Sequence, residues 1–340
     1  MELVLNRPTV NTFGWLHSNG TPVTACVNDS VSLQEECPEG IAGIWEEPGD
    51  VWNMRTGAGQ DAAALLRNTD RRVYHIAAGR QVPGVLRLHY SFDRPDSGTR
   101  VSFELEENSA LTVIMDYSGG SSAAAIGTQI RLGKNASLHL TQIQRTGQAV
   151  FINDIGAECG EDSAFSLIRL ILDGGETYDG CSVELRGDRS VFHGDIGYLA
   201  RGRERLDMNY EAVHKGRNTE SEMNVSGVLS EEAFKLFRGT IDLQRGCAGA
   251  VGNELENVLM MDDTTRNQTI PVILCGEEDV VGNHGATIGR LDEELIFYLE
   301  SRGVDRDSIY DMMARARIEA VIRKIPDETT VAALLPENEG

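Results

Sequence analysis

A histidine and a cysteine near the end of the chain are the residues best suited to bind a metal ion or move a proton. His284 stands in the sequence Gly282-Asn283-His284-Gly285-Ala286-Thr287-Ile288-Gly289, and a neutral imidazole binds iron or exchanges a proton near neutral pH. Cys275, nine residues upstream, offers a thiolate, and the acidic residues 277–279 offer oxygen ligands. We therefore take His284 and Cys275 as candidate metal- or cofactor-binding residues. A simpler interpretation stays open, in which the His284 ring only hydrogen-bonds a turn between a strand and a helix.

Other potential chemistry in the sequence is sparse. His214 precedes Thr219 and Ser221, a setting more typical of a histidine hydrogen-bonded within a repeated coil than of a ligand. The sequence contains neither a Gly-x-x-x-x-Gly-Lys-[Ser/Thr] phosphate-binding loop nor a Gly-x-Ser-x-Gly nucleophile elbow. We therefore expect that the chain is not itself an enzyme and that it has no nucleotide site.

Two helices are expected to follow the His284 sequence. Leu291, Leu295 and Leu299 recur at helical spacing, acidic residues fill the first turn, and Gly303 follows the last periodic position. A second helix is expected to begin at Asp305 or Asp307, to end before Pro326 and to have one apolar face. The residues of that face are Ile309, Met312, Met313, Ala316 and Ala320.

Composition restricts the classes of partner. The chain has 340 residues, with 31 Lys and Arg against 53 Asp and Glu, a net charge of -22. Such a charge repels a phosphate backbone, so we expect no nucleic-acid partner. No apolar run approaches the length of a membrane span and the first 22 residues do not resemble a signal peptide, so a cytoplasmic location without membrane contact is expected. The six cysteines show no Cys-x-x-Cys pair and are expected to be free thiols.

Short β-rich runs with alternating apolar residues fill the middle of the chain, and several recur every 20 to 28 residues. This spacing fits the coils of a parallel β-solenoid, although a sandwich or an antiparallel barrel remains open at this point. We divide the chain into a small N-terminal subdomain (1–70), a β core (71–288) and a C-terminal helical region (289–340). Short helices are expected at Gln60–Arg67 and, less clearly, at Ser230–Phe237. Cys159 and Cys181, and Cys247 and Cys275, are one coil length apart and could stack as a sulfur relay.

The sequence around His284 closely resembles the C-terminal signature of the SufB/SufD family, the scaffold proteins of the Suf iron–sulfur cluster assembly system. The matching positions are Pro271, Glu278-Asp279-Val280, His284-Gly285-Ala286-Thr287, Gly289, Leu291-Asp292, Ile296-Phe297-Tyr298-Leu299 and Ser301-Arg302-Gly303. The His-Gly pair resembles the SufD side of the family. Gly282 stands where the family has a cysteine, and the segment around Leu255 lacks the cysteine of SufB proteins, so thiolate ligation at these two positions is excluded.

The resemblance implies a fold and partners. It implies a mainly β protein, with a right-handed parallel β-helix core flanked by a small N-terminal subdomain and a C-terminal helical region. It implies an ABC-type ATPase partner, SufC, on the C-terminal helices, where Ile309, Met312, Met313 and Ala316 are the expected contacts. It also implies a homodimer, or a heterodimer with a SufB-like paralogue, that meets near His284 and shares a transient iron–sulfur cluster across the interface.

Two classes of function follow. In the favoured hypothesis the chain is a SufD-like scaffold subunit that works with the ATPase to assemble and pass on iron–sulfur clusters. In the alternative it is a β-helix carbohydrate-active enzyme, such as a polysaccharide lyase or hydrolase, which needs a groove of acids or bases facing a sugar.

Overall fold

The computed structural model describes residues 1–12, 14, 18–28, 31–47, 54–120, 122–147 and 149–335. Within them the strands are β1 (Glu2–Leu5), β2 (Thr21–Thr24), β3 (Ser32–Glu36), β4 (Ile44–Glu46), β5 (Arg71–Ile76), β6 (Gln81–Phe92), β7 (Ser97–Leu105), β8 (Ala110–Gly119), β9 (Ala123–Leu132), β10 (Ser137–Arg145), β11 (Val150–Cys159), β12 (Ala164–Asp173), β13 (Glu176–Leu185), β14 (Val191–Ala200), β15 (Arg205–His214), β16 (Glu220–Leu229), β17 (Phe234–Leu243), β18 (Ala250–Met260), β19 (Arg266–Cys275) and β20 (Val280–Gly289). The helices are α1 (Gln60–Leu65), α2 (Glu293–Glu300), α3 (Arg306–Ile322) and α4 (Glu328–Leu334).

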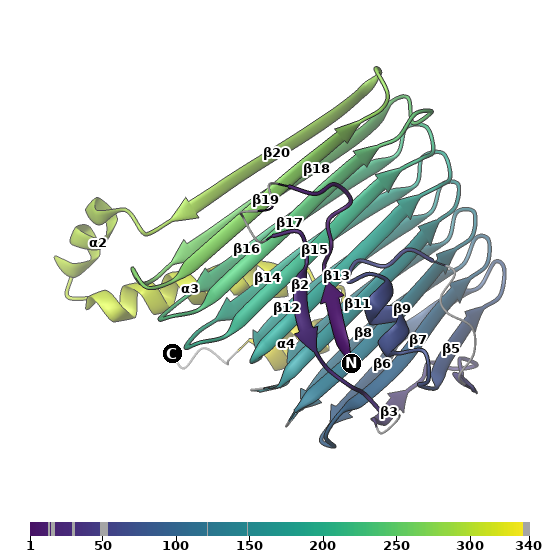
Figure 1. Cartoon of the computed structure of the whole chain (residues 1–340), viewed down its shortest axis with the longest axis horizontal. Coiled ribbons are helices and arrows are strands. Elements are labelled where there is room, and N and C mark those ends of the chain that lie inside the picture. The colour runs from purple at the N-terminus through teal and green to yellow at the C-terminus, as the bar shows by residue number, and fades with distance from the viewer. Residues whose placement is uncertain are drawn as a thin grey trace.

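From β5 onward the chain winds as a parallel β-solenoid, as expected for the core (Figure 1). Alternate strands belong to two nine-stranded sheets, which we name after their last strands. The β19 sheet runs β19-β17-β15-β13-β11-β9-β7-β5-β4, and the β20 sheet runs β20-β18-β16-β14-β12-β10-β8-β6-β3. The sheets face each other, and their inward side chains form one continuous apolar core.

The corners of the coils repeat one conformation that the sequence could have revealed. Residues with positive φ recur at one corner of successive coils, and a small residue follows each of them. These positive-φ residues are Asn108, Asn135, Asp162, Arg189 and Asn218. Asn and Asp tolerate the left-handed region better than most residues do. In four of the five corners the following Ser or Thr hydroxyl donates to a backbone carbonyl three residues earlier, which closes the turn.

Each sheet is partly covered on its outer face. The N-terminal strands β1 and β2 with helix α1 pack on the β19 sheet, where their leucines contact Ala125, Ile152 and Tyr178. The segment leading into α1 lies so close to the sheet that a Cβ added to Gly57 would be 1.9 Å from the Cys181 backbone nitrogen. Helix α3 packs on the β20 sheet through Ile318, Val321 and Ile322, and α4 adds Val331 and Leu334.

The two ends of the solenoid differ. At the first end, β3 and β4 fold back antiparallel on β6 and β5, and they are short and carry glutamates, features that discourage further strand pairing. At the other end, β19 and β20 are ten residues long and each pairs with a strand on one side only. The described part of the chain therefore leaves two long strand edges open.

Most expected helices are confirmed. Helix α1 lies within the expected range, α2 begins after Asp292, and α3 is capped by Asp305, whose carboxylate accepts from the Ser308 backbone. The helix expected at Ser230–Phe237 is wrong, because its second half begins β17, which pairs with strands on both sides. Helix α4 was not anticipated. Among the described residues, no helix combines the length and apolar character needed to cross a membrane.

Candidate functional site

His284 lies in the middle of β20, the last strand of its sheet, and not in a turn. Its register partner in β18 is Glu254, whose own partner in β16 is Met223. In-register neighbours on parallel strands point to the same side of a sheet, and both Met223 and Glu254 are buried in the solenoid interior. His284 therefore extends an inward-facing row, yet it is exposed because no further coil covers it.

The open end around His284 has an apolar surface. Val281 is 50% exposed, and Leu255, Ile273 and Ile288 are also exposed there. Together with the unpaired edges of β19 and β20, these side chains form a surface that we call the open end. Long strand edges beside exposed apolar side chains are typical of a surface that pairs with another chain.

Cys275 shares the open end with His284 but is distant from it. It is the last residue of β19, is exposed, and its thiol donates to the Glu277 carbonyl at 3.1 Å. The side chain nearest to the Cβ position of Gly282 belongs to Ile273, so Pro271 is the β19 residue that faces His284. Cys275 lies four residue steps along the strand from Pro271, about 13 Å. His284 and Cys275 of one chain therefore cannot bind the same metal ion.

The acidic residues 277–279, which lie between Cys275 and His284 in the chain, stabilise the turn from β19 to β20. Glu277 accepts hydrogen bonds from the backbone of Gly246 and Glu278, and these bonds lower the pKa of its carboxyl group. The Asp279 backbone carbonyl accepts from Gly249. Across the described residues, no group of three or more His, Cys, Asp and Glu side chains is arranged to hold a metal ion.

A charged cluster beneath His284 was missed at the sequence level. Glu254, Glu256 and Lys235 are buried just inside the open end. Lys235 pairs with Glu256, which also accepts a hydrogen bond from Thr269 at 2.6 Å. Burial, with the nearby Glu256 charge, raises the pKa of Glu254 to about 7. The sequence signal for this cluster is that charged residues occupy inward positions in strands whose other inward residues are mostly apolar.

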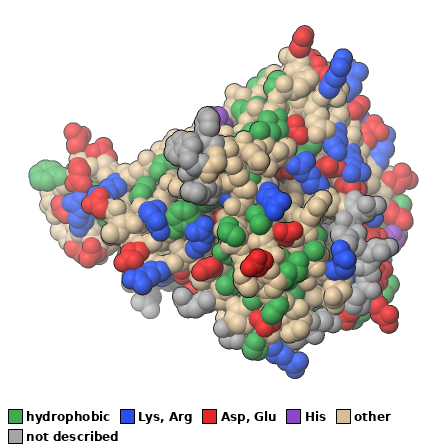
Figure 2. All heavy atoms as spheres, viewed as in Figure 1, with side chains coloured by type: hydrophobic (Ala, Val, Ile, Leu, Met, Phe, Trp, Pro, Cys, Tyr) green, Lys and Arg blue, Asp and Glu red, His purple; other side chains and the backbone are tan. Residues whose placement is uncertain are grey.

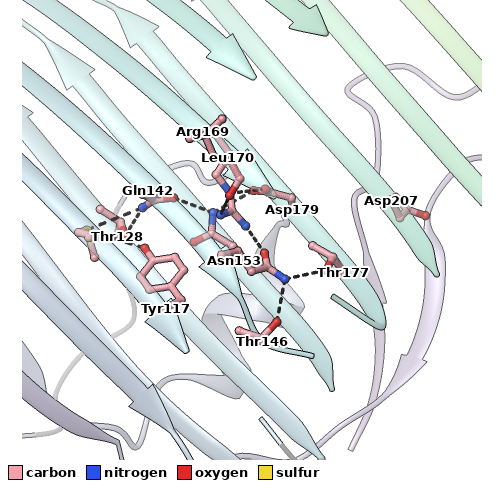
Figure 3. A network of polar contacts seen from close by, with 12 residues as sticks. Tyr117, Thr128, Gln142, Thr146, Asn153, Arg169, Leu170, Thr177, Asp179 and Asp207 are labelled. Carbon is pink, nitrogen blue, oxygen red and sulfur yellow. Dashed lines mark hydrogen bonds and ion pairs between the residues drawn. The ribbon is translucent and has the colours of Figure 1, made fainter. Parts of the chain in front are cut away.

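The solenoid interior also holds a polar network several coils away (Figure 3). Arg169 is fully buried, and its guanidinium donates to Asp179 at 2.6 Å and to Gln144. Asn153 donates to both Asp179 and Gln142, each at 2.9 Å. The network links the two sheets across the interior.

His214 and the buried cysteines have structural environments. His214 bonds Thr219 and Ser221, each at 2.8 Å, and burial lowers its pKa to about 4, so its ring is neutral. The stacked-thiol hypothesis is wrong for Cys159 and Cys181, because Cys159 is in register with Leu185. Burial raises the pKa of Cys159 to about 12, which keeps that thiol protonated. Coils of 26 to 32 residues, longer than expected, explain the error.

The expected partner-binding residues separate into two groups. Ile309 is buried, and Met313 packs with it against Val228 and Leu259. Met312 is 50% exposed and Ala316 is exposed. Helix α2 stands away from the solenoid and forms an arm (Figure 1). Hydrophobic and acidic side chains lie on the surface of this arm (Figure 2).

Helix α2 also adds exposed residues that the sequence reasoning did not select. Phe297 is 73% exposed and Tyr298 is 52% exposed. We call these two residues, together with the exposed Met312 and Ala316 of α3, the arm patch.

Comparison with known proteins relates the chain to one family. The family model described as "SUF system FeS cluster assembly, SufBD core domain" matches residues 93–317, from the coil of β7 into α3. The iron–sulfur cluster assembly protein SufD of Bacillus subtilis is 24% identical over 229 residues, covering 66% of this chain and 52% of the relative. The chloroplastic SufBD family protein ABCI8 of Arabidopsis thaliana is 24% identical over 209 residues, covering 59% and 38%. This chain spans about half the length of these curated relatives or less.

The fold is thus that of a β-solenoid with partly covered outer faces and one open end, and the family match spans most of it. The chain belongs to the SufBD core family of the SUF iron–sulfur cluster assembly system. Membership disfavours the carbohydrate-active enzyme considered from the sequence.

Proposed function

We propose that this chain is a SufD-like scaffold subunit that assembles iron–sulfur clusters with an ABC-type ATPase and passes them to other proteins. In this role the chain acts in the cytoplasm and leaves ATP hydrolysis to its partner. The observation that carries the proposal is the open end, where an exposed histidine of the family signature lies between two unpaired strand edges.

Pairing of two solenoids at the open end would satisfy its backbone groups. Each edge strand has ten residues with hydrogen-bonding groups free on one side, and apolar side chains flank them. The partner is a second copy of this chain or a SufB-like paralogue. Either arrangement brings the inward-facing His284 next to residues of the partner solenoid.

The cluster would be cargo held at this seam. His284 supplies an imidazole nitrogen, and Cys275, about 13 Å away along the strand direction, could bind only a cluster shared with the partner's residues. Few thiolates favour weak retention, which suits a protein that gives its cluster away.

The test is anaerobic reconstitution of this protein with iron and sulfide, alone and with its partners. We expect little stable cluster from the chain alone and more from the complex. His284→Ala should reduce cluster absorbance in the complex while the dimer and its melting temperature stay nearly unchanged. His193→Ala, an exposed histidine on β14, is the matched control. Normal cluster assembly by His284→Ala would reject His284 as a ligand.

The ATPase is proposed to dock on the arm patch. Apolar anchors dominate such interfaces, and Phe297, Tyr298 and Met312 are exposed without a covering element. Ile309 and Met313 support the arm from beneath. Phe297→Asp with Met312→Asp should weaken ATPase binding at least tenfold in a pull-down titration, whereas Val10→Asp, a distant exposed site, should not. Undiminished binding by the folded double variant would remove the arm patch from the interface.

A further inference from the structure

A serine, a histidine and an aspartate form a hydrogen-bonded series on the outer face of the β20 sheet, far along the solenoid from His284. His89 comes from β6, and Asp116 and Ser118 come from the neighbouring β8. The distance from His89 Nδ1 to Asp116 Oδ2 is 3.1 Å, and that from His89 Nε2 to Ser118 Oγ is 3.2 Å. Arg145 of β10 donates to the second Asp116 oxygen at 2.8 Å.

This geometry defines the role of each atom. An ionised carboxylate can only accept, so Asp116 places the ring proton of neutral His89 on Nδ1. The Nε2 lone pair then accepts a hydrogen bond from the Ser118 hydroxyl group. A nucleophile bonded to a base that a third group orients is the arrangement of activated serines. In-register pairing of His89 with Asp116 and of Ser91 with Ser118 holds the three residues together.

A groove lies beside His89 and Asp116, and a backbone donor follows Ser118 in the chain. A groove of about 360 Å³ between α4 and the sheet is lined by His89 and Asp116, by apolar Ile114, Ile143 and Leu334, and by charged Glu36, Arg87 and Arg145. Ser118 lies next to this groove in the hydrogen-bonded series rather than in its lining. Strand β8 ends at Gly119, and Gly120 follows it; both have positive φ. The Gly120 N–H has no acceptor among the described residues.

We propose that Ser118 is the nucleophile of an acyl-transfer site that hydrolyses small esters. Ser118 Oγ attacks the ester carbonyl carbon while its proton passes to His89 Nε2. The bond from the carbonyl carbon to the leaving oxygen breaks, and the leaving alcohol takes that proton. Water, deprotonated by His89, then releases the acid from Ser118, which recovers its proton. The net reaction is ester plus water to acid plus alcohol.

The site is independent of cluster assembly and is tested on the purified full chain without partners. A fluorophosphonate probe should label the protein at Ser118, as mapped by peptide mass spectrometry, with fluoride as the leaving group. Hydrolysis of p-nitrophenyl acetate and butyrate should fall at least tenfold in Ser118→Ala and in His89→Ala. Ser91→Ala is the matched control, because Ser91 lies on the same face and donates to Asp93 instead. It should keep wild-type labelling and turnover.

Three outcomes would overturn the proposal. They are the absence of labelling on the wild-type chain, labelling that maps to another residue, and wild-type turnover by Ser118→Ala. Any of them would leave the three residues as a surface hydrogen-bond network that joins β6, β8 and β10. Because wild-type labelling needs no variant, the proposal remains testable even if a substitution disturbs folding.

Discussion

Replacing Asp179 by alanine should strongly destabilise the solenoid. Arg169 and Asp179 are both fully buried, and Asp179 also accepts from Asn153. The variant leaves the Arg169 charge in the interior with only neutral acceptors, Gln144 and the Leu170 carbonyl. Removing one partner of a buried ion pair costs about 3–5 kcal/mol, mostly as the penalty for the unpaired charge.

The assay is urea unfolding followed by circular dichroism, with the midpoint and slope fitted separately. We expect Asp179→Ala to lower the free energy of unfolding by about 3–5 kcal/mol. The double variant Arg169→Met with Asp179→Leu should recover most of this loss, because it removes both charges. Arg203→Ala, which breaks the exposed pair with Glu232, should unfold close to wild type. A loss below about 1 kcal/mol for Asp179→Ala would refute the claim that the pair is desolvated.

Two further predictions concern the outer face of the β19 sheet. Burial raises the pKa of Asp154 to about 7. Between about pH 4 and 7 the folded state keeps this proton whereas the unfolded state has lost it. The free energy of unfolding should therefore decrease as the pH rises through this range, by on the order of 4 kcal/mol. Asp154→Asn should remove this dependence in chemical denaturation at several pH values, and an unchanged slope would contradict the assignment. Gly57→Ala should lower the melting temperature by several degrees, because the new Cβ would collide with the Cys181 backbone. Gly289→Ala is the control and should not lower it, because a Cβ there would meet no atom within 4 Å. Equal melting temperatures for the two variants would show that the backbone near Gly57 can move to make room.

The sequence predicted the solenoid better than it predicted individual strands. Alternating apolar residues are plain in β6, β8, β10 and β12, where turn residues separate the runs. Strand β11 is hard to recognise because it carries Asn153 on its inward face and Asp154 on its outward face. Strand β15 does alternate, with Leu206, Met208, Tyr210 and Ala212 inward, and its outward polar residues pack beneath the N-terminal subdomain. Asn6, for example, donates to Asp207 of β15 at 2.9 Å.

The candidate site was predicted only in part. The sequence signature pointed to His284. It did not predict that His284 lies in a strand next to Glu254, because that placement depends on the register between β18 and β20. Cys275 was grouped with His284 from nine residues of separation, whereas the chain reverses between them and leaves the two on different sheets. Sequence distance does not reveal such a reversal.

The sequence by itself determined the class of fold, the C-terminal helices and the family, because these depend on local periodicity, capping residues and a contiguous signature. Only the tertiary structure decided which side chains meet. Coil lengths vary between 26 and 32 residues, and a shift of one residue moves a side chain to the opposite face of a sheet. The row from Glu254 to His284 and the Ser118–His89–Asp116 series both depend on that register, which is set by packing between coils.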